Sequence, residues 1–287
     1  MYQISIVIPT YNRPEKLKNC LQSLTKLDYN KNSFEVIVVD DGSPQSLESI
    51  ISYFQPLINL KCIQQKNLGP ATARNKGVSQ AQGEYMAFTD DDCEVTPLWL
   101  SIFADGFAQN PDAILGGFII NKLKENIYSE ASQKLVDYLY SYYNAIPEQS
   151  KFFTSNNFAI SKIIFQKIGG FNTTFPLAAA EDRELCDRLY SQGYKMIYLP
   201  KAQVEHSHYL TLKTFWQQHI NYGKGAKHFH YIKAKKDLQT IKIEPINFYF
   251  NLLIFPIKSD FEIKNIKIMI LFILSQWANL IGFVSKF

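Results

Sequence analysis

Residues 4–14 read ISIVIPTYNRP, and this stretch points to the fold class. Its first five residues, Ile4 to Ile8, are a mostly β-branched run that predicts a buried strand, which Pro9 closes. Pro14 then stands in the first turn of a helix predicted over 14–24, where leucines recur on one face. A buried strand followed directly by an amphipathic helix is the repeating unit of an α/β protein.

The same alternation continues along the chain. Strands are predicted over 34–39, 59–63, 85–88 and 113–120; helices are predicted after Ser43-Pro44 and over 70–79, 99–109, 128–143 and 181–192. Apolar strands that alternate with helices predict a parallel sheet covered on both faces. Ligands of such sheets bind at the carboxyl ends of the strands, where the main acidic clusters of this chain stand.

Composition limits the class of protein. The 287 residues are 46% apolar and 20% charged, which is ordinary for a globular chain with a core. A net charge of +4 is too small to imply nucleic-acid binding. The scattered spacing of the four cysteines suggests neither a zinc site nor a disulfide framework, and a reducing compartment is the simplest inference. The apolar run 4–8 is too short for a signal peptide, so we expect a cytoplasmic protein.

The strongest chemical signal is FTDDD at 88–92, where three adjacent carboxylates follow a buried strand. Because they repel one another, a compensating cation is expected, and a hard divalent ion suits oxygen ligands. Such an ion also holds a diphosphate and neutralises a departing nucleotide. The alternative is a solvated acidic turn that caps the helix after Pro97.

Two further motifs stand near strand ends. In VVDDGS at 38–43, a carboxylate can accept a hydrogen bond from a base N–H; the alternative is a turn with a helix cap. In NLGPATARNKG at 67–77, small residues permit close backbone approach, and Arg74 offers a fork to a phosphate or carboxylate. Arg74 pairing with Asp90 to Asp92 is the alternative there.

Together with IVIPTYNR at 6–13, these motifs resemble the donor half of a family 2 glycosyltransferase with the GT-A fold. The resemblance continues in SNNFAI at 155–160, GGF at 169–171 and EDREL at 181–185, and covers roughly residues 1–225. It implies an α/β, Rossmann-like, mainly parallel sheet flanked by helices. The expected domains are a GT-A domain over 1–225, with a nucleotide-sugar half (1–120) and an acceptor-side half (121–225), and a helical C-terminal extension over 226–287.

The resemblance also implies roles for single residues. The nucleotide-sugar would be held by Pro9, Thr10, Tyr11, Arg13, Asp40, Asp41, Arg74, Asp90 and Asp91. Mn²⁺ or Mg²⁺ would be held by Asp90 and Asp92, with His206 of the V-x-H segment completing the metal or diphosphate site. The sequence leaves open which two of Asp90, Asp91 and Asp92 contact the metal. For His206 and His208, the alternative is a surface or structural histidine. Asp182 would be the catalytic base, and the acceptor would meet Asn156, Asn157, Gly170 and Glu181.

The implied reaction is inverting transfer of a sugar from a UDP-sugar to a hydroxyl of a carbohydrate or lipid-linked acceptor, in cell-surface polysaccharide or glycolipid synthesis. The chain has FWQQH at 215–219 in place of the QxxRW of processive synthases. It lacks the GxGxxG of dehydrogenases and the GK[ST] of P-loop proteins. The alternatives are a non-catalytic nucleotide-sugar-binding module and a sugar nucleotidyltransferase. A nucleotidyltransferase usually has a glycine-rich loop after the first strand, and PTYN at 9–12 is not such a loop.

The tail changes character after about residue 209. Lysines crowd into 224–242, and two apolar blocks follow at 246–257 and 268–284. The second block is near the lower limit for spanning a bilayer. It can cross a membrane, lie in the membrane interface, or pack on the protein with Trp277 and Phe283 in a groove between helices. A cytoplasmic enzyme with peripheral contact to the inner face of the plasma membrane is the expectation for the second case.

Overall fold

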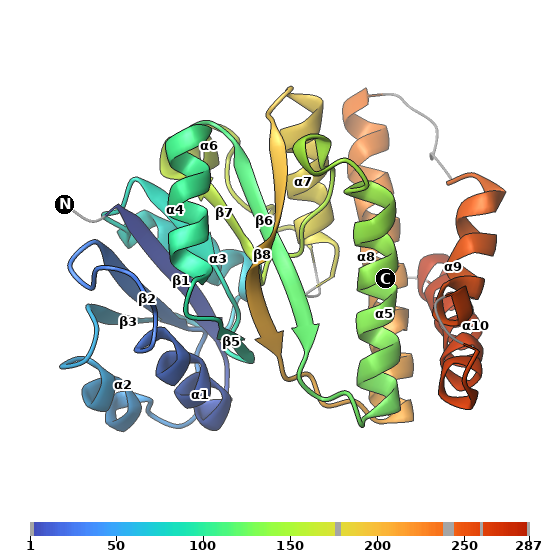
Figure 1. Ribbon diagram of the computed structural model, residues 1–287, viewed down its shortest axis with the longest axis horizontal. Helices are drawn as coiled ribbons and strands as arrows, with labels where there is room; N and C mark the ends of the chain where they lie inside the picture. The colour runs from blue at the N-terminus through green and yellow to red at the C-terminus, as the bar shows by residue number, and fades with distance from the viewer. Residues whose placement is uncertain (1–2, 176–178, 238–243, 259–260, 286–287) are drawn as a thin grey trace. The chain divides into compact units, whose positions relative to one another are not determined.

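The structure, a computed structural model, describes residues 3–175, 179–237, 244–258 and 261–285 (Figure 1). The chain forms two compact units. The sheet unit comprises Met1–Ile120, Tyr143–Thr173 and Asp182–Ser207; the helical unit comprises Asn121–Tyr142, Thr174–Glu181 and His208–Phe287. The domain boundary expected at 225 remains a prediction, and α8 (Leu212–Asp237) runs through it as one helix.

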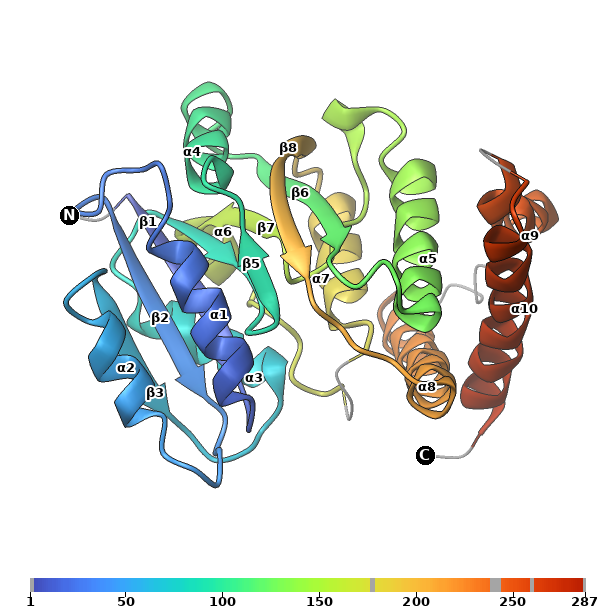
Figure 2. The ribbon, with the colours of Figure 1, turned by 60° about the horizontal axis from the view of Figure 1, so that its bottom comes forward.

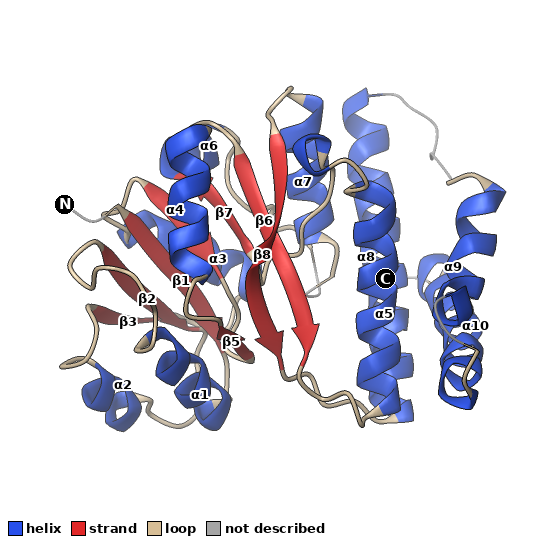
Figure 3. Cartoon of the chain, in the orientation of Figure 1, coloured by secondary structure: helices blue, strands red, loops and turns tan. Residues whose placement is uncertain are grey.

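The sheet unit is built on a mixed sheet (Figure 3). Within the described residues its strand order is β3-β2-β1-β4-β7-β6-β8-β5. The strands are β1 Ile4–Thr10, β2 Phe34–Asp40, β3 Leu60–Gln64, β4 Tyr85–Phe88, β5 Cys93–Val95, β6 Ile114–Asn121, β7 Phe158–Ser161 and β8 Met196–His206. The half β3-β2-β1-β4 is parallel. The other half is joined through antiparallel pairs of β4 with β7, β6 with β7, and β5 with β8.

Helices cover both faces of the parallel half (Figure 2). They are α1 Pro14–Leu24, α2 Glu48–Phe54 and α3 Pro70–Gln80. Later in the chain the sheet unit also contains α4 Trp99–Gln109, the 3₁₀ turn η1 Pro147–Gln149, α6 Lys162–Lys167 and α7 Glu181–Ser191. Helix α3 packs so closely on β1 and β2 that a Cβ at Gly77 would lie 2.4 Å from the Val7 side chain. All residues of β1 and β2 are buried, as a parallel sheet covered on both faces requires.

The helix predicted to open at Ser43-Pro44 begins instead at Glu48, so that prediction is wrong. The Asp40 carboxylate accepts a hydrogen bond from the Ser43 N–H at 2.9 Å, which holds this segment in a turn. Gly42 adopts a φ of +85°, and a Cβ there would lie 3.0 Å from the Asn67 backbone nitrogen. The turn therefore uses the Asp40 side chain and the Ser43 backbone N–H before the helix can start.

The helical unit contains α5 Ile127–Tyr143, α8, α9 Ile246–Lys258 and α10 Ile263–Val284. Its core is a cluster of buried apolar side chains: Ala131, Leu135, Tyr138, Leu210, Phe215, Phe248, Leu252, Ile268, Leu271 and Phe272. Helices α8 and α10 approach backbone to backbone. A Cβ added to Gly223 would lie 2.0 Å from the Asn279 carbonyl oxygen, and one added to Gly282 would lie 2.0 Å from the Ile220 carbonyl oxygen.

The two apolar blocks of the tail are both helical, and each gives one face to this core. Phe248 and Leu252 of α9 and Ile268, Leu271 and Phe272 of α10 belong to the buried cluster. Trp277, in contrast, is 59% exposed, so its expected place in a groove between helices is wrong. Helix α10 is also long and apolar enough to cross a membrane, by length and composition alone.

Candidate active site

The candidate site lies at the carboxyl edge of the parallel half of the sheet. Thr10 ends β1 and pairs in register with Asp40, which ends β2. The triplet Asp90 to Asp92 follows β4, the other neighbour of β1. The strand order therefore brings together polar residues that are up to 82 positions apart in the sequence.

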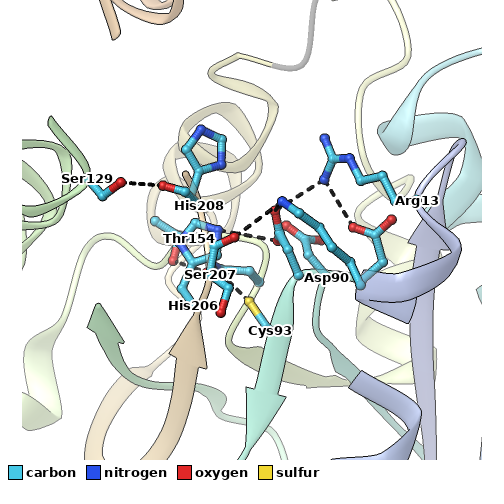
Figure 4. Close-up of polar contacts among 12 residues, drawn as sticks. Arg13, Asp90, Cys93, Ser129, Thr154, His206, Ser207 and His208 are labelled. Atoms are coloured by element: carbon cyan, nitrogen blue, oxygen red, sulfur yellow. Dashed lines mark hydrogen bonds and ion pairs between the residues drawn. The ribbon is translucent and has the colours of Figure 1, made fainter. Parts of the chain in front are cut away.

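Two cationic side chains at the start of α1, Arg13 and Lys16, contact Asp91 and Asp92. Figure 4 shows Arg13 near the segment that carries Asp90. Arg13 Nη1 lies 3.0 Å from Asp91 Oδ1 and 3.2 Å from Asp92 Oδ2. Lys16 Nζ lies 3.2 Å from the same Asp92 oxygen and also donates to the Ser207 carbonyl. Both carboxylates have only 4% of their side-chain surface exposed, so these contacts compensate charge that water cannot reach.

The first carboxylate of the triplet has a different partner. Arg74 Nη2 lies 2.6 Å from Asp90 Oδ1, and the Arg74 side chain is 97% buried while Asp90 keeps 27% exposure. The guanidinium also lies over the Phe171 ring, 5.3 Å from its centre. Of the two readings of Arg74 from the sequence, the structure shows the pairing with the triplet. A buried guanidinium fixed in this way presents its fork in one direction.

Asp91 is a perturbed carboxyl at this edge. Burial raises its pKa to about 6, and the neighbouring charges of Asp92 and Asp90 add to the rise. Arg13 and a 2.8 Å hydrogen bond donated by the Thr10 hydroxyl act in the opposite direction. Three crowded carboxylates beside a strand end thus need positive charge, which the sequence predicted.

Asp92 also faces a second pair of ligand atoms. Cys93 of β5 stands opposite His206 of β8 in the antiparallel pair, and His206 Nε2 lies 3.3 Å from Asp92 Oδ1. The carboxylate oxygen, the Cys93 sulfur and an imidazole nitrogen all lie within 4.8 Å of one another. Among the described residues this is the candidate metal cluster, and its oxygen and nitrogen donors fit a divalent cation.

The two acids of VVDDGS hold backbone segments. Asp41 accepts hydrogen bonds from the Leu68 and Gly69 N–H groups at 2.9 and 2.8 Å and from the Gln65 side chain. It thereby fixes the loop before α3. Asp40, which is 4% exposed, accepts the Ser43 N–H with one oxygen. Pro9 is buried within β1, whereas Tyr11 is 47% exposed.

Asp182 stands in the first turn of α7, where its carboxylate accepts the Arg183 N–H at 2.7 Å. Burial raises the pKa of Asp182 above the usual aspartate value. Backbone N–H groups and the positive charge of Arg74 pull the pKa down but do not overcome the burial. The helix N-terminus alone predicts a low pKa, so the direction differs from that expectation because the surrounding protein desolvates the half-buried carboxyl.

The residues expected to contact the acceptor differ in burial and in their hydrogen-bond partners. Asn157 is fully buried, and its amide contacts Trp99 Nε1 and the Phe118 and Ala202 carbonyls, so we interpret it as a core residue. Asn156 Nδ2 donates to the Cys93 sulfur at 3.6 Å. Gly170 has a φ of +66° in a loop whose next residue, Phe171, is clamped by the Asn75 amide at 2.8 and 2.9 Å. Glu181, the first residue of α7, is 6% exposed.

Sequence reasoning missed two members of this site. Lys16 lies three residues after Arg13, a spacing that puts both on one face of a helix, and this signal was available. Cys93 was dismissed because its cysteine spacing fits no zinc motif. Its partner His206 lies 113 positions away, and only the pairing of β5 with β8 brings the two together. His208 is not on that strand, since β8 ends at His206, and its Nε2 contacts Gln218.

Residues 5–169 match the family model described as glycosyl transferase family 2, and residues 139–214 match one described as N-terminal domain of galactosyltransferase. A chondroitin synthase of Escherichia coli is 30% identical over 225 residues, which are 66% of this chain and 32% of that protein. A glucosyl-dolichyl phosphate glucuronosyltransferase of Haloferax volcanii is 25% identical over 257 residues, 82% of this chain and 80% of that protein. The chain thus spans about a third of the length of the first relative.

The fold has solved counterparts. A mannosyltransferase from Pyrobaculum calidifontis, in complex with GDP-Man and Mn²⁺, superposes with a TM-score of 0.64 at 17% identity, over 100% of this chain and 77% of that chain. TarS of Staphylococcus aureus gives a TM-score of 0.59 at 17% identity, over 98% and 89%. At this identity the likeness concerns the fold, and it confirms the predicted GT-A architecture.

Proposed function

The chain belongs to glycosyl transferase family 2 and is a sugar-transferring enzyme, and on this premise we propose that it moves a sugar from a UDP-sugar to an acceptor hydroxyl with inversion at the anomeric carbon. The observation that carries the proposal is the convergence of Asp90 to Asp92 with Arg13, Lys16 and Arg74 at one sheet edge. A cluster of this kind suits a diphosphate and a divalent cation rather than an uncharged ligand.

In this mechanism each side chain acts on a stated atom. Arg13, Lys16 and Arg74 would orient the donor diphosphate, and Asp40 would accept a hydrogen bond from the base. Asp182 would take the proton of the acceptor hydroxyl while that oxygen bonds to the anomeric carbon and the bond to the diphosphate breaks. Mn²⁺ or Mg²⁺ held by Asp92 and His206, with Asp90, would offset the charge on the leaving diphosphate.

Ligand binding separates an enzyme from a binding module. We expect UDP with Mn²⁺ to raise the melting temperature, because a ligand of the native state stabilises it by mass action. UDP-sugars and GDP-mannose, the donor in the Pyrobaculum complex, should be screened for hydrolysis with and without Mn²⁺. A thermal shift without turnover of any donor favours the non-catalytic module. A shift with GDP alone overturns the proposed UDP specificity.

The metal requirement is tested at Asp92. Asp92→Asn keeps the size of the side chain but removes the charge that faces His206 and Lys16. We expect it to abolish Mn²⁺-stimulated donor hydrolysis while the circular dichroism spectrum stays native. Glu94→Gln, two residues further on β5, is the matched control and should retain the stimulation. Full activity of Asp92→Asn in EDTA would show that the reaction needs no metal at this site.

The tail supports a proposal about location and acceptor. One face of α10 packs in the helical core; the other exposes Ile263, Ile270, Ile273, Trp277, Leu280, Ile281 and Val284. Residues 208–287 carry eleven lysines against four acidic residues. We propose that this face lies in the headgroup region of an anionic membrane at the cytoplasmic side, where it meets a lipid-linked acceptor. The name of the Haloferax relative describes a dolichyl phosphate acceptor of that kind.

Vesicle flotation tests this face. The full-length protein should float with phosphatidylglycerol vesicles at low salt, and less at high salt because the lysine attraction is screened. The double variant Ile270→Asp/Trp277→Asp should stay at the bottom of the gradient. Tyr53→Asp, an equally exposed aromatic position on α2, is the control and should float. Absence of wild-type flotation at low salt rules out membrane contact through α10.

A further inference from the structure

Cys93 is placed by strand pairing in the candidate metal cluster. It stands directly opposite His206 in the antiparallel pair of β5 and β8. Side chains directly opposite each other in such a pair point to the same face of the sheet. Asp92 precedes Cys93, and its Oδ1 lies 3.3 Å from His206 Nε2. The three ligand atoms, oxygen, sulfur and nitrogen, all lie within 4.8 Å of one another. Figure 4 shows Cys93 and His206 on the two paired strands.

This donor set differs chemically from that of a manganese or magnesium site. Mn²⁺ and Mg²⁺ suit carboxylate and water oxygens, whereas a thiolate beside an imidazole selects zinc. A tetrahedral zinc ion with oxygen and nitrogen bonds of about 2.0–2.1 Å has ligand-to-ligand edges of about 3.3 Å. The distance of 3.3 Å between Asp92 Oδ1 and His206 Nε2 already matches such an edge.

The surroundings of the sulfur also suit a metal ligand. Asn156 Nδ2 donates a hydrogen bond to Cys93 Sγ at 3.6 Å, and the Thr154 hydroxyl donates to the Asn156 oxygen at 2.7 Å. These two hydrogen bonds hold the Asn156 amide with its N–H toward the Cys93 sulfur. Contacts of this kind orient metal ligands. Cys93 is fully buried, while His206 keeps 25% of its side-chain surface exposed, which gives the cluster a side toward solvent.

We propose that Asp92, Cys93 and His206 form a zinc site that overlaps the proposed catalytic metal site, so that Zn²⁺ inhibits the enzyme by occupying it. The inference rests on the proposed function, because Asp92 and His206 belong to both sites. When Zn²⁺ binds, the Cys93 sulfur forms the metal bond and its thiol proton leaves to water; no electrons are exchanged. Zinc is held by the sulfur, whereas the catalytic Mn²⁺ or Mg²⁺ needs only the oxygen and nitrogen donors.

Cobalt provides the direct test, because a thiolate bound to Co²⁺ gives a charge-transfer band in the near ultraviolet. The full-length protein titrated with CoCl₂ should develop this band, and ZnCl₂ should remove it at concentrations where MnCl₂ does not. Cys93→Ser should lack the band and bind Zn²⁺ roughly 100-fold more weakly, since a hydroxyl replaces the soft ligand. Cys62→Ser, which changes an exposed thiol on β3, is the control and should keep the band.

Two further measurements keep the outcomes separate. If Cys93→Ser does not fold, His206→Asn tests the same site, because it keeps the thiol but should also weaken Zn²⁺ binding. A band that persists in Cys93→Ser overturns the proposal. A wild-type protein that is stabilised by Mn²⁺ and UDP yet shows no cobalt band overturns the zinc site alone. A protein that shows the band but ignores Mn²⁺ and UDP supports the zinc site and overturns the proposed function.

Discussion

Among single side chains, Asp182 has the most demanding proposed task. It is an acid near a helix N-terminus whose carboxylate is held by the Arg183 N–H. Asp182→Asn keeps this hydrogen-bond acceptor but cannot take a proton. We expect transfer to fall by roughly 10²–10⁴-fold while UDP binding stays near normal. Asp187→Asn, on the same helix, should retain activity. Loss of UDP binding with an unchanged turnover number would show that Asp182 is a donor ligand.

The raised pKa of Asp182 predicts how kcat/KM of the proposed transfer depends on pH. Because burial raises this pKa above the ordinary aspartate value, the carboxyl becomes protonated at a higher pH than a free aspartate would. A protonated base cannot accept a proton, so kcat/KM should fall as the pH drops through this pKa. The pH profile of kcat/KM should show this acidic limb, and the residual activity of Asp182→Asn should lack it. A wild-type limb at or below the ordinary aspartate pKa contradicts the base assignment.

His219 gives a second pH effect, on stability. It is 3% exposed against the Phe215 ring, and neither ring nitrogen has a hydrogen-bond partner among the described residues. Burial lowers its pKa from 6.5 to about 4. Between pH 6.5 and about pH 4, the His219 ring is protonated in the unfolded chain but not in the folded chain. The free energy of unfolding therefore falls by roughly 2–3 kcal/mol as the pH drops.

Urea unfolding at about pH 7.5 and pH 5 measures this loss. His219→Phe should remove most of the difference between the two midpoints, because an apolar ring needs neither a proton nor a hydrogen bond. His208→Phe is the control and should leave the difference as in the wild type. Equal pH dependence of His219→Phe and wild type would exclude His219 as its source.

The residues of the site were predictable to the extent that they belong to local motifs. Arg13, Asp40 and the triplet all lie within a few positions of a recognisable strand end, and Arg74 lies in a helix that the sequence predicted. Cys93 has no local signal of that kind, because its partner comes from a strand late in the chain. The function of Asp41 was also hidden, since the backbone groups it holds at Leu68 and Gly69 carry no side-chain signature.

Secondary-structure elements were predictable where burial is continuous. Strands β1 to β4 and helices α1 and α3 match the predicted ranges within one or two residues. Strands β5 and β7 were missed because they have only three and four residues. Strand β8 was missed because Pro200 and Lys201, both exposed, interrupt its apolar pattern. The part of α8 after residue 225 lies in the predicted helical extension, but residues 212–225 were missed because their apolar positions do not form a clear stripe.

The contact of α8 with α10 depends on glycine. Gly223→Ala would place a methyl group 2.0 Å from the Asn279 carbonyl oxygen, so the helices must separate. The intrinsic helix propensity of alanine favours the substitution by about 1 kcal/mol, and overpacking should outweigh this with a loss of roughly 1–3 kcal/mol. Thermal unfolding should show a lower midpoint. Lys213→Ala, exposed on α8, should change little; a raised midpoint for Gly223→Ala would mean that the helices do not touch there.

For the whole molecule, the tail is a structural necessity as well as a candidate membrane surface. Deleting 246–287 removes Phe248, Leu252, Ile268, Leu271 and Phe272 from the buried cluster. At about 1.5–3 kcal/mol for each buried side chain, the loss is of the order of a domain's whole stability. The truncated protein should aggregate on expression, whereas the full-length protein should not. A soluble truncation with full donor hydrolysis would refute this structural role.

The pairing of β5 with β8 has a consequence for how the enzyme comes into being. Cys93 and His206 are 113 positions apart, and a ribosome that adds about 5–20 residues per second needs roughly 6–23 s to pass from one to the other. The nascent chain exposes the acidic triplet throughout that interval without its imidazole. A fragment that ends before His206 lacks the imidazole of the proposed site, so the proposal places assembly of the full ligand set after the synthesis of His206.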